Sequence, residues 1–282
     1  MWTGGVMDGE PGWVPPGIDV RRANVARVYD YLLGGSHNFL ADQDLGRSLA
    51  ATDPSIRAIA RANRDFLGRA VRFLTAAGVG QFLDIGSGIP TQGNVHEVAQ
   101  QASPECRVVY ADVDPGAIAH SKALLAGKEN TAIIDADLRQ PEEILAHAGT
   151  RRLIDLSQPA GLLMTAVVHF VGDEYDPWRL LARYLDGLAP GSYLALSHLT
   201  DDHKPPRAVA EFRRVFDHAT EQMHFRSKLD VERLFSGLDL MSPRYPDGGG
   251  QLDYAGDWGA EDLALSDSDG SRWLYCGVAR RP

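Results

Sequence analysis

The sequence predicts an α/β fold, in which a doubly wound sheet of mostly parallel strands carries helices on both faces. Three observations predict it. An apolar run ends at Gly86 and Gly88 and leads into a helix, a second strand and Asp112, which is the βαβ unit that begins a Rossmann-like sheet. Strands and helices then alternate along the chain, as a parallel sheet requires. Residues 272–279 alternate apolar and polar side chains, which indicates an antiparallel last strand.

The composition predicts a soluble, cytoplasmic protein. Of the 282 residues 44% are apolar, and we see no apolar run near the length of about 18 residues that indicates a membrane span. The first residues lack the basic and apolar blocks of a secretion signal. The 38 acidic residues outnumber the 28 basic ones, which argues against general nucleic-acid binding. Cys106 and Cys276 fit neither a disulfide framework nor a metal cluster, so we expect two free thiols and no metal site.

The chain before the first strand is expected to be helical. Apolar residues at helical spacing predict helices over 20–33 and 41–51, and Asp53-Pro54 is typical of the start of a long third helix. Such a segment is long enough to fold as a lid over the open ends of the strands. The resulting division is a flexible tail at 1–18, an N-terminal helical lid at 19–78 and a sheet domain at 79–282.

The third helix carries Asn63 in the middle of its apolar stripe. A buried amide must find hydrogen-bond partners, so we expect Asn63 to tie this helix to a neighbouring loop. Five arginines surround it and are interpreted as a solvated face rather than an anion site: Arg57, Arg61, Arg64, Arg69 and Arg72.

The turn after the first strand is the first candidate binding site. Gly86-Ser87-Gly88 allows positive φ angles and lets a ligand approach the backbone. Asp84 beside this turn suits a cationic or hydroxyl-rich ligand better than a pyrophosphate. Asn94 with Glu97 three residues later predicts the start of the next helix.

The second strand, residues 107–110, runs into Asp112-Val113-Asp114-Pro115. Asp112 follows Gly88 by 24 positions, close to the spacing of about 20 at which a carboxylate binds ribose hydroxyls. Either acid is also a possible cap for the helix that begins at Pro115. We assign Asp114 to the cap and Asp112 to the ligand.

Polar residues also follow the next three strands. The third strand leads to Asp137-Leu138, where the acid can accept a hydrogen bond from an exocyclic amine and the leucine can cover a ring; a helix cap is an equally good interpretation. The fourth strand, 160–168, ends at His169-Phe170, and the fifth, 192–196, ends at Ser197-His198. Because ligands of parallel sheets lie beyond the carboxyl ends of the strands, we expect the binding site there.

The last third of the chain contains two more predicted helices, near 206–216 and 227–235, and a strand at 238–241. Residues 246–271 hold seven acids and neither lysine nor arginine. We interpret this acidic stretch as a solvated excursion before the last strand.

These motifs resemble those of class I S-adenosylmethionine-dependent methyltransferases. Asp84-x-Gly86-x-Gly88 is similar to their first motif, Asp112 to their ribose-binding acid and Asp137-Leu138 to their adenine-contacting pair. The chain is more narrowly similar to an actinobacterial group of these enzymes without an assigned substrate, through the stretches 26–35 (ARVYDYLLGG) and 61–64 (RANR). One departure is Pro90, where many class I enzymes have a third glycine, so the loop after Gly88 must differ.

The resemblance implies a seven-stranded sheet whose last strand is antiparallel, with S-adenosyl-L-methionine bound by the domain at 79–282. It implies methyl transfer to an unidentified acceptor, which we expect to be a small molecule. The cofactor-binding residues that it implies are Asp84, Gly86, Ser87, Gly88, Asp112, Val113, Asp137 and Leu138.

The acceptor side of the predicted site is aromatic and polar. The aromatic residues expected near the sulfonium are Tyr29, Tyr31, Phe39 and Phe170. The lid would turn Tyr31, His37 and Asn38 toward the acceptor. His169 or His198 is a candidate general base, since a neutral imidazole can take a proton near pH 7; the alternative for each is a structural, hydrogen-bonded histidine.

Two other functions remain open at this point. The absence of an unmistakable base in the sequence allows a non-catalytic module that binds the cofactor or a partner protein. A nicotinamide-dependent oxidoreductase shares the βαβ start, but Thr91 stands where its third glycine is expected. The oligomeric state is left undetermined.

Overall fold

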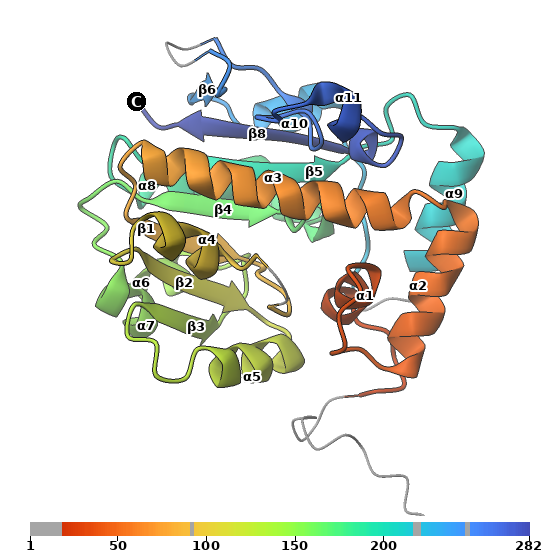
Figure 1. Cartoon of the computed structure of the whole chain (residues 1–282), viewed down its shortest axis with the longest axis horizontal. Helices are drawn as coiled ribbons and strands as arrows, with labels where there is room; N and C mark the ends of the chain where they lie inside the picture. The colour runs from red at the N-terminus through yellow and green to blue at the C-terminus, as the bar shows by residue number, and fades with distance from the viewer. Residues whose placement is uncertain (1–18, 91–92, 217–220, 246–248) are drawn as a thin grey trace, which may run out of the picture.

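The computed structural model describes residues 19–90, 93–216, 221–245 and 249–282, and a twisted sheet forms its centre (Figure 1). The predicted flexible tail at 1–18 lies outside the described residues. The strands of the described chain are β1 (Gln81–Ile85), β2 (Arg107–Asp112), β3 (Thr131–Asp135), β4 (Gly161–Thr165), β5 (Tyr193–Leu199), β6 (Asp239–Met241), β7 (Asp253–Tyr254) and β8 (Leu274–Arg280).

The order of the strands confirms the predicted doubly wound topology. The sheet runs β3-β2-β1-β4-β5-β8-β6, and the two-residue strand β7 adds to β8 beside this seven-stranded path. Strands β1 to β5 pair in parallel, whereas β8 is antiparallel to β5. The chain crosses from one half of the sheet to the other between β1 and β4, so the carboxyl end of β1 lies at the switch point where such sheets bind ligands.

Helices cover both faces of the sheet because neighbouring strand residues point to opposite sides. Phe82 and Val108 belong to the core that includes α3, whereas Leu83 and Val109 belong to the core on the other face. The helices are α1 (Val25–Leu32), α2 (Leu40–Thr52), α3 (Ile56–Ala76), α4 (Val95–Ala102), α5 (Pro115–Leu124), α6 (Pro141–Ala146), α7 (Ala148–Leu153), α8 (Pro177–Asp186), α9 (Pro206–Phe216), α10 (Lys228–Arg233) and α11 (Leu263–Ser266). Within the described chain, none of these helices is both long and apolar enough to cross a membrane.

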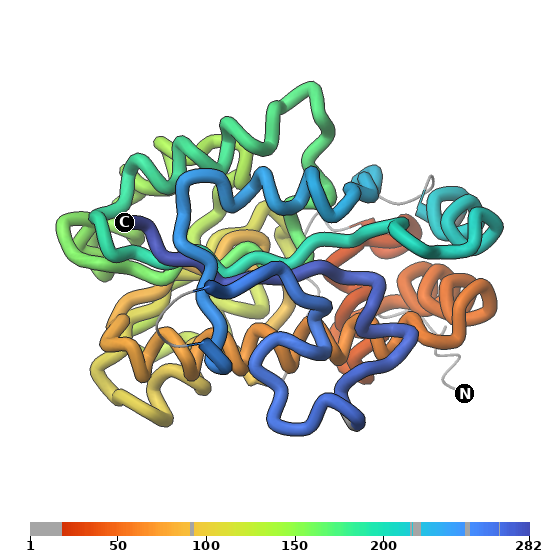
Figure 2. The backbone as a smooth tube through the Cα atoms, turned by 90° about the horizontal axis from the view of Figure 1, so that it is seen from above, coloured from red at the N-terminus to blue at the C-terminus, as the bar shows by residue number. Residues whose placement is uncertain are grey.

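The N-terminal helices reach beyond the carboxyl ends of the strands. Figure 1 shows α3 lying along the sheet, with α1 past the arrowheads of β2 and β3. Figure 2 shows α2 beside α9 at the same end of the molecule, and the two helices are in contact. The first helix begins at Val25, later than predicted, because the Asn24 side chain accepts hydrogen bonds from the amides of Ala26 and Arg27 and so caps it.

Two strand ends differ from the sequence prediction. Strand β4 stops at Thr165, since the next residue, Ala166, has a φ of 54° and the chain then forms a short 3-10 helix, Val168–Phe170. Strand β5 continues to Leu199 because its antiparallel pairing with β8 extends that far. As a result, His198 lies inside a strand rather than after one.

The interpretation of the acidic stretch as a solvated excursion is wrong for its middle part. Leu252, Ala255 and Trp258 are at most 3% exposed, and β7 pairs with β8. The Trp258 ring packs edge-on against Phe66 and Phe73 of α3, at centroid distances of 5.4 and 5.6 Å. These apolar residues bury the segment against α3, while the acids between them stay nearer the surface.

Candidate functional site

One cavity of about 370 Å³ lies at the carboxyl ends of the central strands. Its lining comes from the turns after β1, β2, β3 and β4, from α1 and α3, and from α9 and the segment that follows it. All eight residues predicted to bind the cofactor share this lining: Asp84, Gly86, Ser87, Gly88, Asp112, Val113, Asp137 and Leu138.

The glycine turn is shaped by its two left-handed residues. Gly86 and Gly88 have φ angles of 67° and 64°. A Cβ on Gly86 would lie 2.1 Å from a methyl group of Val167, so only glycine fits there, whereas at Gly88 the space is open. The Ser87 hydroxyl oxygen is buried and finds no hydrogen-bond partner among the described residues. The turn therefore presents open backbone and an unsatisfied hydroxyl group.

Asp114 is the helix cap, as predicted, whereas Asp112 lines the cavity. Asp114 caps α5 by accepting a 2.7 Å hydrogen bond from the amide of Ala117. Asp112 accepts from the amide of Gly88 at 2.7 Å and from that of Asp114 at 2.9 Å. Burial raises the pKa of Asp112, although these hydrogen bonds oppose the rise. The glycine turn and Asp112 are thus joined directly.

Asp84 is a buried carboxyl group that faces the cavity. It is 5% exposed, and burial raises its pKa to about 7, partly offset by the charge of Arg64 and reinforced by that of Asp112. A carboxyl group with a pKa near 7 is only partly ionised at pH 7, and a cation placed beside it favours its charged form. Asp84 is therefore matched to a positively charged part of a ligand.

Arg64 is a site residue that sequence reasoning missed. It lines the cavity from α3, and its Nε atom is buried without a hydrogen-bond partner among the described residues. Its guanidinium lies 5.7 Å from the centroid of the Tyr29 ring. The interpretation of the arginine run as a solvated face is therefore wrong for Arg64. The signal in the sequence was its position next to Asn63, at the border of the apolar stripe.

Asp137 is held by Arg139. Two nitrogens of the guanidinium bind the carboxylate, at 2.9 and 2.5 Å. Burial disfavours the charged form, but the hydrogen bonds from Arg139 outweigh it and leave the pKa of Asp137 below its usual value. The alternative that Asp137 caps the next helix is wrong, because Gln140 occupies that position of α6.

The two candidate histidines have different surroundings. His169 lines the cavity and is 3% exposed; its Nδ1 atom has no partner among the described residues. Burial, followed by the charges of His198 and Arg226, lowers its pKa well below the usual value, so the ring is neutral. The unpaired Nδ1 of this neutral ring can therefore accept a hydrogen bond from a molecule in the cavity.

His198 is occupied by structural contacts. Its Nδ1 donates to the carbonyl of Leu199 at 2.7 Å, and its Nε2 accepts from Arg226 at 2.8 Å. Burial, reinforced by Arg226, lowers its pKa to about 3. The described lining of the cavity does not include it. The prediction of His198 as a base is corrected to a structural role, because both ring nitrogens are engaged.

Of the residues predicted to face the acceptor or the sulfonium from the lid, Tyr29 lines the cavity. It also begins a chain of hydrogen bonds. Its hydroxyl oxygen accepts from the Asn63 amide at 3.0 Å, and the Asn63 carbonyl oxygen accepts from the hydroxyl of Ser197. The Ser197 oxygen in turn accepts from the amide of Ala166 at 2.9 Å. Asn63 thus joins α3 to α1 and to β5, and through Ser197 to the turn that carries His169. The prediction that it ties α3 to a neighbouring loop is corrected, because its partners lie on a helix and a strand.

Four other predicted lid residues lie outside the described lining of the cavity, namely Tyr31, His37, Asn38 and Phe39. Tyr31 packs on Gly46, where a Cβ would lie 2.4 Å from its ring, and under Arg57. Their expected orientation toward the acceptor is corrected, because the polar network of the α1–α2 connection holds three of them. Phe170 does line the cavity, as predicted.

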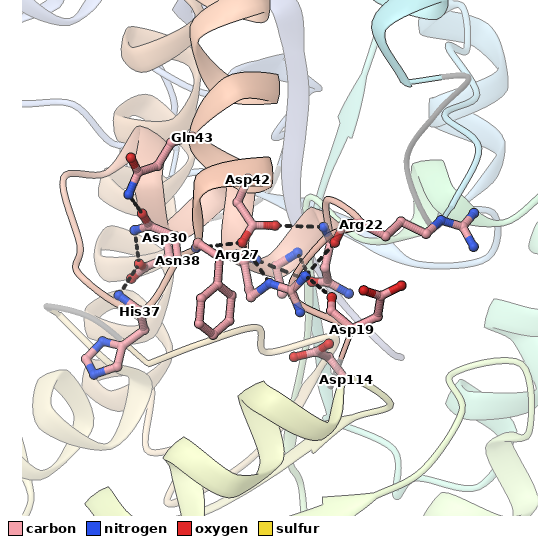
Figure 3. Close-up of polar contacts among 12 residues, drawn as sticks. Asp19, Arg22, Arg27, Asp30, His37, Asn38, Asp42, Gln43 and Asp114 are labelled. Atoms are coloured by element: carbon pink, nitrogen blue, oxygen red, sulfur yellow. Dashed lines mark hydrogen bonds and ion pairs between the residues drawn. The ribbon is translucent and has the colours of Figure 1, made fainter. Parts of the chain in front are cut away.

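Figure 3 shows this network, in which two buried acids organise the connection between α1 and α2. Asp30 accepts hydrogen bonds from the backbone amide of His37 and from the Asn38 side chain, both at 2.8 Å. Asp42 accepts from Arg27 and from the amide of Phe39, also at 2.8 Å. The His37 ring packs at a tilt against His120 of α5, with 3.7 Å between centroids, so the connection also contacts the sheet domain.

Comparison with known proteins places the chain among relatives of the same fold. The family described as S-adenosyl methyltransferase matches residues 11–282. A crystal structure of a candidate methyltransferase from Thermobifida fusca is 38% identical, with a TM-score of 0.87 over 96% of this chain and 99% of that one. A DUF574 family protein from Streptomyces avermitilis is 38% identical, with a TM-score of 0.86 over 94% and 99%. No curated protein matches the sequence.

Proposed function

The chain belongs to the S-adenosyl methyltransferase family and is an S-adenosylmethionine-dependent enzyme, and from this premise we propose that it methylates a small molecule held between the cofactor and His169. The observation that carries the proposal is the convergence of three strand-end acids, Arg64 and a neutral histidine on one cavity. A volume of about 370 Å³ falls within the range of roughly 300–1,000 Å³ that is common for small-molecule sites.

The residues of the cavity fit the cofactor. A buried carboxyl group with a raised pKa, Asp84, suits the ammonium end, and the unpaired Nε of Arg64 suits the carboxylate beside it. Asp112 is placed for the ribose hydroxyls by the amide of Gly88. Leu138, Val113 and Asp137 are assigned to the adenine. The orphaned hydroxyl of Ser87 adds a polar group where the methionine part passes the glycine turn.

The protein's own contribution is to bind, align and exclude water. Bound S-adenosylmethionine supplies a methyl group on a positively charged sulfur. Tyr29 and Phe170 give the cavity aromatic walls, which favour a cation by about 0.5–2 kcal/mol each. His169, neutral and buried, accepts the hydrogen bond of the acceptor. Helices α1 and α3 line the cavity, so that the acceptor meets the methyl group away from bulk water.

The test is methyl transfer from S-adenosylmethionine labelled in its methyl group. The full chain is incubated with a bacterial extract that has been separated by ultrafiltration into small molecules and macromolecules. We expect label in the small-molecule fraction, and a strong loss of transfer in Asp112→Asn. Label confined to the macromolecular fraction would contradict a small-molecule acceptor while leaving the methyltransferase activity intact.

A further inference from the structure

The cavity extends past the cofactor residues into a pocket of apolar side chains, which we call the apolar arm. It is defined by Leu32, Leu49, Ile56, Leu67, Phe212 and Leu274. These residues come from α1, α2, α3, α9 and β8, and none is more than 5% exposed. Five elements that lie far apart in the sequence thus enclose one apolar space at the end of the molecule where α2 meets α9 (Figure 2).

Charge is distributed unevenly along the described lining. The carboxylates belong to the turns after β1, β2 and β3 or to Glu221, and the arginines are Arg64 and Arg139. The apolar arm contributes neither an acid nor a base from the residues that define it. Moving an ion into such surroundings without a partner is costly, whereas an apolar cavity binds apolar molecules readily. The arm therefore favours an uncharged occupant.

His169 offers a polar partner to that occupant. His169 Nδ1 is buried in the lining and lacks a partner among the described residues. An unpaired buried nitrogen is destabilising, and a ligand that pairs with it restores the missing hydrogen bond. A bound molecule with one hydroxyl group satisfies His169, and the rest of the molecule can then be apolar.

We propose that the acceptor is an uncharged, mainly apolar alcohol or phenol, whose body fills the apolar arm and whose single hydroxyl group pairs with His169. This rests on the proposed function and names its substrate class. The class excludes amino acids, sugar phosphates and other charged metabolites as acceptors. The hydroxyl group lies near the glycine turn, since His169 belongs to the short helix that follows Val167, the residue against which Gly86 packs.

The first experiment measures binding without turnover. The full chain is saturated with S-adenosylhomocysteine and titrated with phenol, 2-naphthol and 1-hydroxypyrene, and in parallel with 2-naphthoate, by fluorescence or calorimetry. We expect at least one neutral alcohol to bind 10-fold or more tightly than the carboxylate. The proposal is overturned if the carboxylate binds equally well, or if no alcohol of the series binds.

Two alanines of α3 provide a matched pair of variants. Ala60 lines the cavity and is 3% exposed, whereas Ala76 is exposed at the end of the same helix. Ala60→Leu should weaken binding of the best alcohol at least 10-fold, and Ala76→Leu should leave it unchanged. Equal behaviour of the two variants contradicts the assignment of the arm.

A third variant tests the hydrogen bond. In His169→Leu, 2-naphthol should lose its advantage over naphthalene, while S-adenosylhomocysteine still binds within about 3-fold of the parent; a retained preference for the alcohol overturns the role of His169. Failure here is distinguishable from failure of the proposed function. If the parent protein does not bind the cofactor, or if label appears only in macromolecules, the proposed function is contradicted. If label is transferred to charged small molecules, only the proposed substrate class is contradicted.

Discussion

Arg64 and Arg61 stand three positions apart on α3 but meet different surroundings. Arg61 is exposed, while Arg64 lines the cavity with its Nε buried. If Arg64 holds the carboxylate of the cofactor, Arg64→Gln should weaken S-adenosylhomocysteine about 10-fold to 100-fold, the effect of a charged hydrogen bond. Binding of 5′-methylthioadenosine, which lacks the amino-acid end, should stay unchanged. Calorimetry of both ligands, with Arg61→Gln as control, checks this; equal losses for both ligands would refute the assignment.

Asp84 makes the stability of the free protein depend on pH. Its pKa is raised by burial to about 7, so the neutral carboxyl group favours the folded state. This contribution is fully present below the unfolded pKa of about 4, and it is lost as pH rises through about 7. Because of this group, the free energy of unfolding in urea should be lower at pH 8 than at pH 5, by about 2–4 kcal/mol.

Asp84→Asn should flatten that pH dependence, whereas Asp186→Asn, at an exposed position on α8, should not. A cation bound beside Asp84 must lower its pKa again, so binding of S-adenosylhomocysteine near pH 6 should release protons. Calorimetry in buffers of different ionisation enthalpy measures this release. Absence of proton release in the parent protein would show that the ammonium group lies elsewhere.

At the scale of elements, Ser197 connects the end of β5 to the turn after β4. Its oxygen accepts from Ala166, whose φ of 54° is a strained value for a residue other than glycine. Ser192, at the other end of β5, accepts a 3.0 Å bond from Ala160 in the same way. Each Ser→Ala change should cost about 1–3 kcal/mol of unfolding free energy. Only Ser197→Ala should speed amide hydrogen exchange over 166–170, because of the two serine side-chain bonds only that of Ser197 reaches this turn.

Hydrogen exchange followed by mass spectrometry separates the two variants. Faster exchange over 166–170 in both would mean that global destabilisation, rather than the lost bond at Ala166, controls the turn. Affinity for S-adenosylhomocysteine should change less than 3-fold in either, since neither serine is in the described lining of the cavity.

Strand identities were predictable from local pattern, but strand ends were not. The apolar runs located β1 to β5, and the Asn94 and Glu97 signature marked the start of α4, where both sides of the capping box are present. The end of β5 depends on β8, which lies about 75 residues later in sequence and pairs with it up to Leu199. His198 was placed outside the strand for this reason. No local pattern reports such a partner.

For the whole molecule, too, local sequence patterns predicted some features and missed others that depend on distant parts of the chain. The carboxyl-end site was predictable because parallel strands must align their ends, which brought Asp84, Asp112 and Asp137 to one cavity. The acidic stretch was misjudged because its buried residues are few and separated by acids. Trp258 gains its contacts from Phe66 and Phe73, nearly two hundred residues earlier. Only the assembled fold reveals that partner.

Trp258 also joins the last quarter of the chain to α3. Arg69 of α3 donates to the carbonyl of Trp258 at 2.8 Å and to that of Ala255 at 2.6 Å, and the indole donates to Met241 at 3.1 Å. The same core cluster contains residues of α1, α3 and β8. We therefore propose that α3 is part of the core of the sheet domain rather than of a separate lid.

Removing this tryptophan should accordingly destabilise the entire chain. Trp258→Ala should lower the free energy of unfolding by about 3–5 kcal/mol, the usual cost of deleting a buried aromatic side chain. Leu263→Ala, on exposed α11 in the same acidic stretch, should change it by less than about 0.5 kcal/mol. Urea unfolding followed by far-UV circular dichroism gives both values. If α3 belongs to the core, the parent protein unfolds in one transition, and Trp258→Ala shifts this whole transition to lower urea concentration. A separate early transition that is larger in the variant would instead show that the acidic segment unfolds independently of the sheet.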